Sequence, residues 1–144
     1  MANHSIVHIL QIKGTPEQVF EMVSTPAGLD QWWTKGSKGR PELGSLYKLD
    51  FGSVLWQAQV SHMVAPQEFE FTMTRCDPDW MDTTISFKIA RTNDSTTVTF
   101  EHSGWPLANQ HFHGSNYCWA MYLRILKRFV EHGEQVPYEE RLNV

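Results

Sequence analysis

The strongest hydrophobic pattern in the chain lies in residues 110–133. Apolar side chains recur there at the spacing of one helical face, at Trp119, Tyr122, Leu123, Leu126 and Val130. Basic residues occupy the opposite face and the last turn, where positive charge complements the helix dipole. Gly133 follows, and glycine readily takes the left-handed conformation that ends a helix. The pattern predicts a long helix with one broad apolar face, which needs a large surface to pack on.

Six earlier segments are expected to be strands. The first is rich in β-branched residues and leaves its buried face ambiguous, whereas the other five alternate apolar and polar residues, the pattern typical of one buried face. They span residues 4–13, 46–51, 54–64, 67–75, 82–91 and 96–103. Short turn signals, such as Gly52-Ser53 and Ala65-Pro66, separate most of the later neighbours. We therefore expect six strands in one antiparallel meander.

Two short helices are expected between the first strand and the rest. Thr15 precedes Pro16 and lies three residues before Gln18, which forms a capping box with proline at the first helical position. Thr25 and Pro26 repeat the signal. We predict a first helix from residue 16 to residue 23 or 24 and a second over 26–33, followed by a glycine-rich loop over 34–45.

This order of elements predicts an α+β fold with a single domain over residues 1–133. The remaining residues, 134–144, form a polar C-terminal tail that contains Pro137. We expect this tail to run over the surface or to be loosely ordered.

Charge and cysteine content argue against several classes of partner. The chain has 144 residues and a net charge of −4 with no block of like charges, so neither nucleic acid nor a membrane surface is an expected partner. Residues 1–5 lack a basic segment and no long apolar run follows, which argues against a signal peptide and a membrane span. Cys76 and Cys118 show no paired spacing, so a reducing, cytoplasmic setting is expected.

Four segments of the chain, taken together, resemble a known family. They are TPEQVF at 15–20, the tryptophan pair at 32–33, TVTFEHSGWP at 97–106 and WAMYLRILK at 119–127. In this order they resemble the AHSA-like branch of the START/SRPBCC superfamily, named after the activator of heat shock protein 90 ATPase homologue. The resemblance implies a START-like helix-grip fold, in which a curved six-stranded antiparallel sheet wraps around the long C-terminal helix and leaves a cavity between them.

Two departures from the family pattern affect the expected pocket. The family is usually richer in glycine where this chain has Glu42-Leu43-Gly44, and it usually has glycine before the helix tryptophan, where this chain has Cys118. Both changes leave the fold alone but alter the shape and chemistry of the pocket mouth.

Aromatic residues near the wider end of such a grip either line a ligand pocket or belong to the ordinary core. Trp32, Trp33, Trp80, Trp105 and Phe112 lie at element ends or in loops. The ligand-binding candidates are Trp32, Trp33, Trp56, Phe71, Arg75, Phe87, His102, Trp105, Phe112, Cys118, Trp119 and Tyr122. We hypothesise that the protein binds a small apolar or aromatic molecule between sheet and helix, with no cofactor and no assigned reaction.

An enzymatic alternative rests on three polar side chains, His102, Arg75 and His62. Each extends an apolar strand face. The alternative interpretation is that each one ends a strand or, for His102, completes the core. The superfamily that the chain resembles includes polyketide cyclases and aromatases. The resemblance implies that such groups would polarise and deprotonate a bound substrate. This alternative requires at least two of them to converge inside one cavity.

Other catalytic chemistry finds little support in the sequence. His111 and His113, with His102 before them, suggest a metal site, but no carboxylate or cysteine follows at ligand spacing, so none is expected. Cys118 is interpreted as a small buried side chain because no base is fixed beside it. The chain also lacks GxSxG, GxGxxG, Walker and HExxH motifs, so a conventional enzyme is not the favoured interpretation.

Two interactions with other proteins are further alternatives. The family name suggests a domain that regulates the ATPase of heat shock protein 90, although no feature of the sequence marks a chaperone-binding face. The exposed first strand would also allow a homodimer, because a free sheet edge can pair with a copy of itself.

Overall fold

The computed structural model describes residues 3–144. Two of the five N-terminal residues on which the prediction of no signal peptide rests lie outside this range. Its elements, in order, are β1 (His4–Ile12), α1 (Pro16–Ser24), α2 (Pro26–Leu29), β2 (Gly36–Lys38), β3 (Leu46–Asp50), β4 (Leu55–Val64), β5 (Glu68–Arg75), η1 (Pro78–Trp80), β6 (Thr84–Thr92), β7 (Ser95–Trp105), α3 (Gln110–His132) and η2 (Tyr138–Asn143). No helix among these residues is long and apolar enough to cross a membrane.

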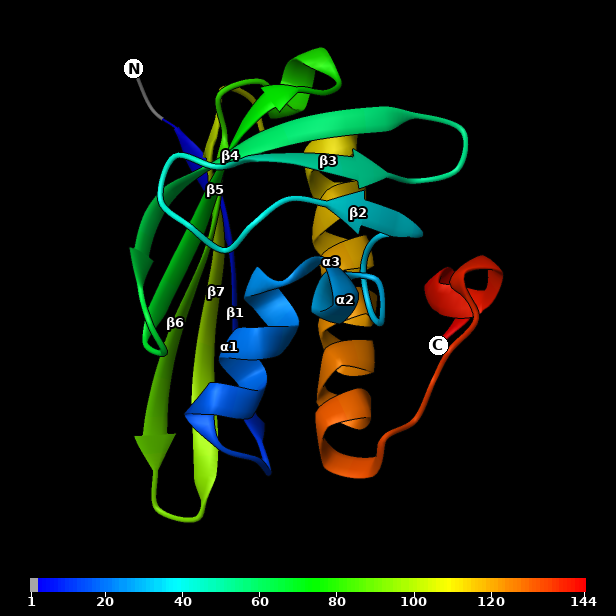
Figure 1. Cartoon of the computed structure of the whole chain (residues 1–144). Helices are drawn as coiled ribbons and strands as arrows, with labels where there is room; N and C mark the ends of the chain where they lie inside the picture. The colour runs from blue at the N-terminus through cyan, green and yellow to red at the C-terminus, as the bar shows by residue number, and fades with distance from the viewer. Residues whose placement is uncertain (1–2) are drawn as a thin grey trace.

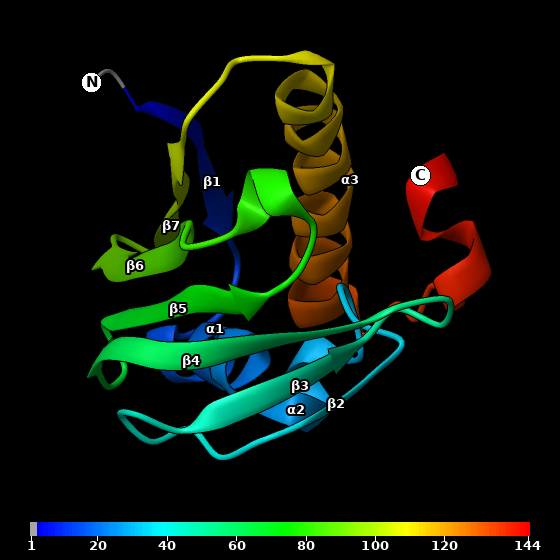
Figure 2. The ribbon, with the colours of Figure 1, turned by 90° about the horizontal axis from the view of Figure 1, so that it is seen from above.

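The strands form one antiparallel sheet in the order β1-β7-β6-β5-β4-β3-β2. Seen from above, the sheet curls around α3, with β1 and β2 at its two ends (Figure 2). The helix-grip fold is therefore confirmed, with seven strands where six were expected. The additional strand, β2, has three residues and begins at Gly36. So short a strand is formed by pairing with β3 rather than by any alternation of its own.

The two short helices begin where their capping residues predict. The Thr15 hydroxyl accepts from the Gln18 amide and the Gln18 side chain accepts from the Thr15 amide, so the capping box is complete. The Thr25 hydroxyl accepts from the Gly28 amide at the start of α2. However, α2 ends at Leu29 instead of residue 33. The Asp30 carboxylate accepts from the hydroxyls of Thr34 and Ser37, so the chain after Leu29 turns towards β2.

The long C-terminal helix α3 matches the expected range and lies in the hollow of the sheet (Figure 1). The Asn109 side chain caps its start by accepting from the Phe112 amide. Gly133 ends it in the left-handed conformation, at φ 66°. Helical geometry continues through Gly114, although glycine costs a helix about 1 kcal/mol. Trp119, together with Leu123, Ile125 and Leu126, is buried against the sheet.

The C-terminal segment, residues 134–144, is fastened to the domain instead of lying loosely on it. The Arg141 guanidinium, which is 6% exposed, donates to the carbonyls of Asp30, Thr34 and Val136. The Tyr138 hydroxyl donates to the Phe51 carbonyl over 2.9 Å. Of the two expectations for the tail, the structure has the segment running over the surface. The sequence did not indicate that Arg141 would bond to two carbonyls of the turn after α2 and to one within the segment itself.

We predict that Arg141→Met destabilises the protein by about 1–3 kcal/mol, because two buried carbonyls and one partly buried carbonyl lose a charged donor. Urea unfolding should show this loss, and limited proteolysis should cut the segment after Gly133 sooner. Arg40→Met is the control, since Arg40 is an exposed arginine. Equal stability of the two variants would contradict the anchoring role.

Candidate functional site

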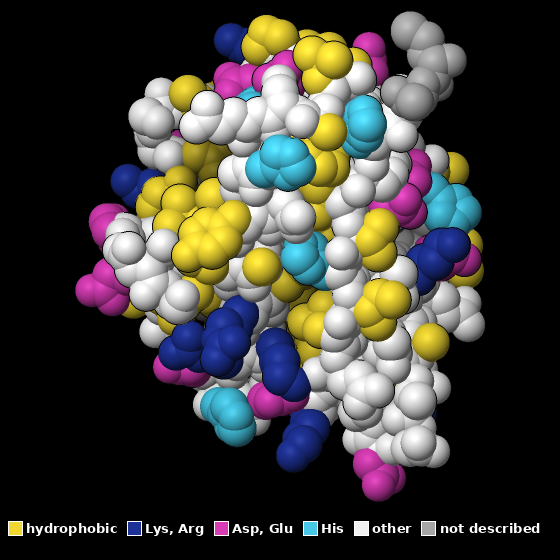
Figure 3. Space-filling model, turned by 180° about the vertical axis from the view of Figure 1, so that it is seen from behind, with side chains coloured by type: hydrophobic (Ala, Val, Ile, Leu, Met, Phe, Trp, Pro, Cys, Tyr) yellow, Lys and Arg dark blue, Asp and Glu magenta, His cyan; other side chains and the backbone are white. Residues whose placement is uncertain are grey.

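A cavity of about 480 Å³ opens between α3, the β3–β4 hairpin, η1 and the C-terminal segment. Its thirteen lining residues are Trp33, Phe51, Ser53, Val54, Trp56, Trp80, His111, Gly114, Ser115, Cys118, Trp119, Tyr122 and Tyr138. Seven of them are Trp, Phe or Tyr, so most of the wall is flat and apolar. From behind, hydrophobic side chains gather on the side of the molecule where the C-terminal segment lies (Figure 3).

Five aromatic side chains in this wall contact one another in a closed circuit, which we call the aromatic circuit. Going round it, the ring centroids are 5.4 Å apart for Trp33 and Phe51, 5.4 Å for Phe51 and Trp56, and 4.9 Å for Trp56 and Trp80. Trp80 and Trp119 follow at 5.9 Å, and Trp119 returns to Trp33 at 5.2 Å. Phe51 and Trp56 belong to the β3–β4 hairpin and the other three residues come from separate segments, so the tertiary fold brings these four parts of the chain together.

His102 lies behind this wall and is fully buried. The Trp119 indole donates to its Nδ1 over 3.1 Å, so Nδ1 must be the unprotonated nitrogen. Its Nε2 then donates to the Thr83 hydroxyl over 2.8 Å, and Thr83 donates to the Trp80 carbonyl over 2.6 Å. Burial, with a smaller contribution from His111, lowers the pKa of His102 to about 3. The imidazole is therefore neutral and fixes Trp119 relative to η1.

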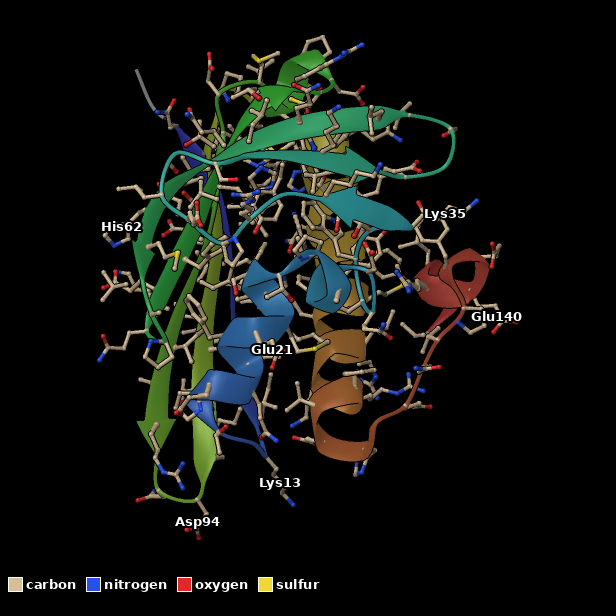
Figure 4. The ribbon with its side chains drawn as sticks, viewed as in Figure 1. Lys13, Glu21, Lys35, His62, Asp94 and Glu140 are labelled. Atoms are coloured by element: carbon tan, nitrogen blue, oxygen red, sulfur yellow. The ribbon has the colours of Figure 1, made fainter. Side chains whose placement is uncertain are left out.

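The three residues of the enzymatic alternative do not meet. His102 does not line the cavity, because Trp80 and Trp119 stand between it and the open space. His62 follows a register shift after Val60 that turns it outwards, where it pairs with Glu68 over 3.3 Å (Figure 4). Arg75 is exposed at the end of β5. The condition that two of them converge in one cavity is not met.

Of the remaining ligand-binding candidates, five reach the cavity: Trp33, Trp56, Cys118, Trp119 and Tyr122. The other five, Trp32, Phe71, Phe87, Trp105 and Phe112, are buried in the core. Trp32 stacks on Trp33, with ring centroids 6.2 Å apart, but lies on its inner side, where its indole donates to the Met22 carbonyl on α1. Phe71 packs against Tyr47, and Phe87 against Trp32.

Several lining residues were absent from the sequence-based set. Phe51 continues the buried face of β3, so strand periodicity alone could have identified it. Trp80 was noted as an aromatic residue in a loop, and the structure places it in the aromatic circuit. Tyr138 lies in the C-terminal segment, where no pattern in the sequence indicated packing.

The polar groups of the cavity are few and mostly neutral. Burial raises the pKa of Tyr122 to about 12 and raises that of the Cys118 thiol, so both stay protonated near neutral pH and Cys118 is a poor nucleophile. At one end of the cavity, His111 Nδ1 lies 3.0 Å from the Asp79 carboxylate. Among residues 3–144, no three metal-ligating side chains lie close enough together to hold an ion.

An antiparallel sheet gripping a C-terminal helix, with an aromatic cavity between them, defines the helix-grip class of α+β proteins. Residues 13–131 match the family described as activator of Hsp90 ATPase homolog 1-like protein. The chain belongs to this family. A comparison with the curated proteins gave no match.

Solved structures show the same architecture. The Aha1 dimer from Colwellia psychrerythraea is 30% identical to this chain, with a TM-score of 0.83 over 93% of this chain and 99% of that one. A protein from Staphylococcus saprophyticus is 21% identical, with a TM-score of 0.79 over 92% and 96%. CalU16 from Micromonospora echinospora is 17% identical, with a TM-score of 0.77 over 98% and 85%. The last two likenesses concern the fold alone.

We predict that His102 makes the stability of the protein depend on pH in one window. The pKa of the imidazole is about 6.5 when unfolded and about 3 when folded, so between these values the unfolded chain binds one more proton. Stability therefore falls as the pH drops from 6.5 towards 3, by on the order of 1 kcal/mol per pH unit. Urea unfolding from pH 7.5 to 4.5 measures it.

The control for this prediction is His102→Gln, whose amide can accept from Trp119 and donate to Thr83 but does not titrate. The stability difference between the two proteins should shrink as the pH falls. A difference that stays constant would show that His102 is not a buried neutral group.

Proposed function

We propose that the protein binds a small apolar or aromatic molecule in the cavity between the sheet and α3. The observation that carries the proposal is the aromatic circuit around a space of about 480 Å³. Ligand pockets typically have volumes of roughly 300–1,000 Å³ and mostly apolar walls with a few polar groups. Indole and phenyl faces attract flat rings through dispersion and quadrupole interactions, so a planar aromatic molecule fits these walls best.

The polar groups at the rim support orientation of a ligand more than chemistry on it. His111, Ser115 and the Tyr122 hydroxyl are spread along α3, and none of the proposed acid–base residues accompanies them. The chaperone-regulating alternative rests on the family description, and we do not adopt it as the proposed function. A reducing, cytoplasmic setting remains our proposal for where this binding takes place, with both cysteines free.

We expect Gly114→Leu to weaken binding of the neutral aromatic probe N-phenyl-1-naphthylamine by about tenfold or more. Gly114 lines the cavity, and a Cβ built on it meets open space, so a leucine side chain would fill part of the volume. Replacing a helical glycine should also stabilise α3 by up to about 1 kcal/mol. Probe fluorescence titration measures the affinity, and thermal unfolding verifies the fold.

Ala120→Leu is the matched control, because Ala120 is an exposed residue of α3 outside the cavity lining. It should bind the probe as the unmodified protein does. Two results would contradict the proposal: no binding of the probe by the unmodified protein, or binding that Gly114→Leu leaves unchanged.

We also propose that the chain forms a homodimer. The support is the Colwellia psychrerythraea structure, which is 30% identical, similar over almost its full length, and described as a dimer.

A further inference from the structure

The two edges of the sheet differ in how they are protected from pairing with another strand. At one edge, β2 has three residues and is flanked and ended by the exposed Lys35 and Lys38. Short length and lysine side chains are the usual means of blocking an edge. At the other edge, β1 has nine residues with no proline and no Asp, Glu, Lys or Arg. Lys13 follows this strand, and α3 covers only that end of it, through Lys127 and Glu131. The rest of the β1 edge lacks such protection.

The free backbone groups of β1 can be identified from one contact with α3. Lys127 Nζ donates to the Gln11 carbonyl, so this carbonyl points away from β7. Backbone groups alternate in direction along a strand, and Val7 and Ile9 therefore also direct their N–H and C=O towards the open edge. Among residues 3–144, no backbone group outside the sheet bonds to either residue.

The same two residues carry the exposed apolar side chains of the strand. Val7 is 51% exposed and Ile9 is 68% exposed, both on the face of the sheet away from α3. Isolated apolar residues at a surface need no explanation. Here, however, two apolar side chains and the unpaired backbone groups belong to the same short stretch of an edge strand.

We propose that β1 is the dimer interface and pairs antiparallel with β1 of a second copy, with His8 next to the two-fold axis. Val7 then lies opposite the partner's Ile9, and Ile9 opposite the partner's Val7. These two pairs supply four backbone hydrogen bonds and leave the Gln11 carbonyl with Lys127. The proposal rests on the homodimer proposed above and adds its location and register.

The two neighbouring registers fit less well. If the axis passed through Val7, Ile9 would lie opposite the partner's Ser5. If it passed through Ile9, Val7 would lie opposite the partner's Gln11. The register centred on His8 places each exposed apolar side chain beside another, and apolar cross-strand pairs are the more stabilising ones.

The first experiment measures the oligomeric state by sedimentation velocity from 1 to about 300 μM. Val7→Lys with Ile9→Lys should weaken dimerisation at least a hundredfold, because four lysines would meet at the axis. The matched control is Leu46→Lys with Leu55→Lys, at residues that are 51% and 44% exposed on β3 and β4. The control should dimerise normally, and both variants should bind N-phenyl-1-naphthylamine normally.

The second experiment tests the register with single cysteines at Val7, His8 or Ile9, each in a Cys76→Ser, Cys118→Ala background. Only the residue on the two-fold axis faces itself, at the Cα separation that a disulfide bridges. We expect His8→Cys to form a disulfide-linked dimer on mild oxidation and the other two to form little.

The possible failures are distinguishable. A monomer at all concentrations would overturn both the homodimer and its interface. A dimer that the Val7 and Ile9 lysines leave intact would overturn the interface while the homodimer stands. Cross-linking that is fastest through Val7→Cys or Ile9→Cys would overturn the register. None of these outcomes bears on ligand binding in the cavity, which the probe titration tests separately.

Discussion

The site depends on one buried chain of hydrogen bonds, from the Trp119 indole through His102 and Thr83 to the Trp80 carbonyl. It joins α3 to β7 and β7 to the segment between β5 and β6. Hydrogen bonds between buried groups are costly to leave unmade, so these three parts of the chain hold one another in a single arrangement. Two tryptophans of the cavity wall are consequently placed by a histidine that does not itself line the cavity.

The rest of the wall is assembled from segments that are unrelated in sequence. Trp33 follows α2, Phe51 follows β3, Trp56 lies on β4 and Tyr138 comes from the C-terminal segment. Arg141 ties that segment to the turn after α2. The cavity is therefore assembled by the whole domain, and we expect loss of the Arg141 contacts to alter its shape through Tyr138.

Local sequence rules were sufficient to predict most helices and strands, but they were not sufficient to predict which residues line the cavity. Thr15, Pro16 and Gly133 mark helix ends because capping is decided by a few neighbouring residues. By contrast, Trp32 and Trp33 are adjacent, equally apolar and both buried, yet only Trp33 lines the cavity. The positions of their side chains depend on the turns after Leu29, which are determined by contacts with α1 and β2. The position of His62 could not be predicted either, because strand alternation does not reveal the register shift between Val60 and His62 that turns its side chain outwards.

The aromatic circuit also gives the protein an optical property. Four of its six tryptophans, Trp33, Trp56, Trp80 and Trp119, line one cavity, and the other two lie in the core. Indole rings at these separations exchange excitation energy, so they absorb and emit as a coupled group. We therefore expect the cavity wall to contribute strongly to the near-ultraviolet circular dichroism and the fluorescence of the protein, together with Trp32 and Trp105, which lie 6.2 Å from Trp33 and 6.0 Å from Trp80. A molecule that binds in the cavity is then expected to change the protein's own fluorescence, so that its binding can be followed without any label.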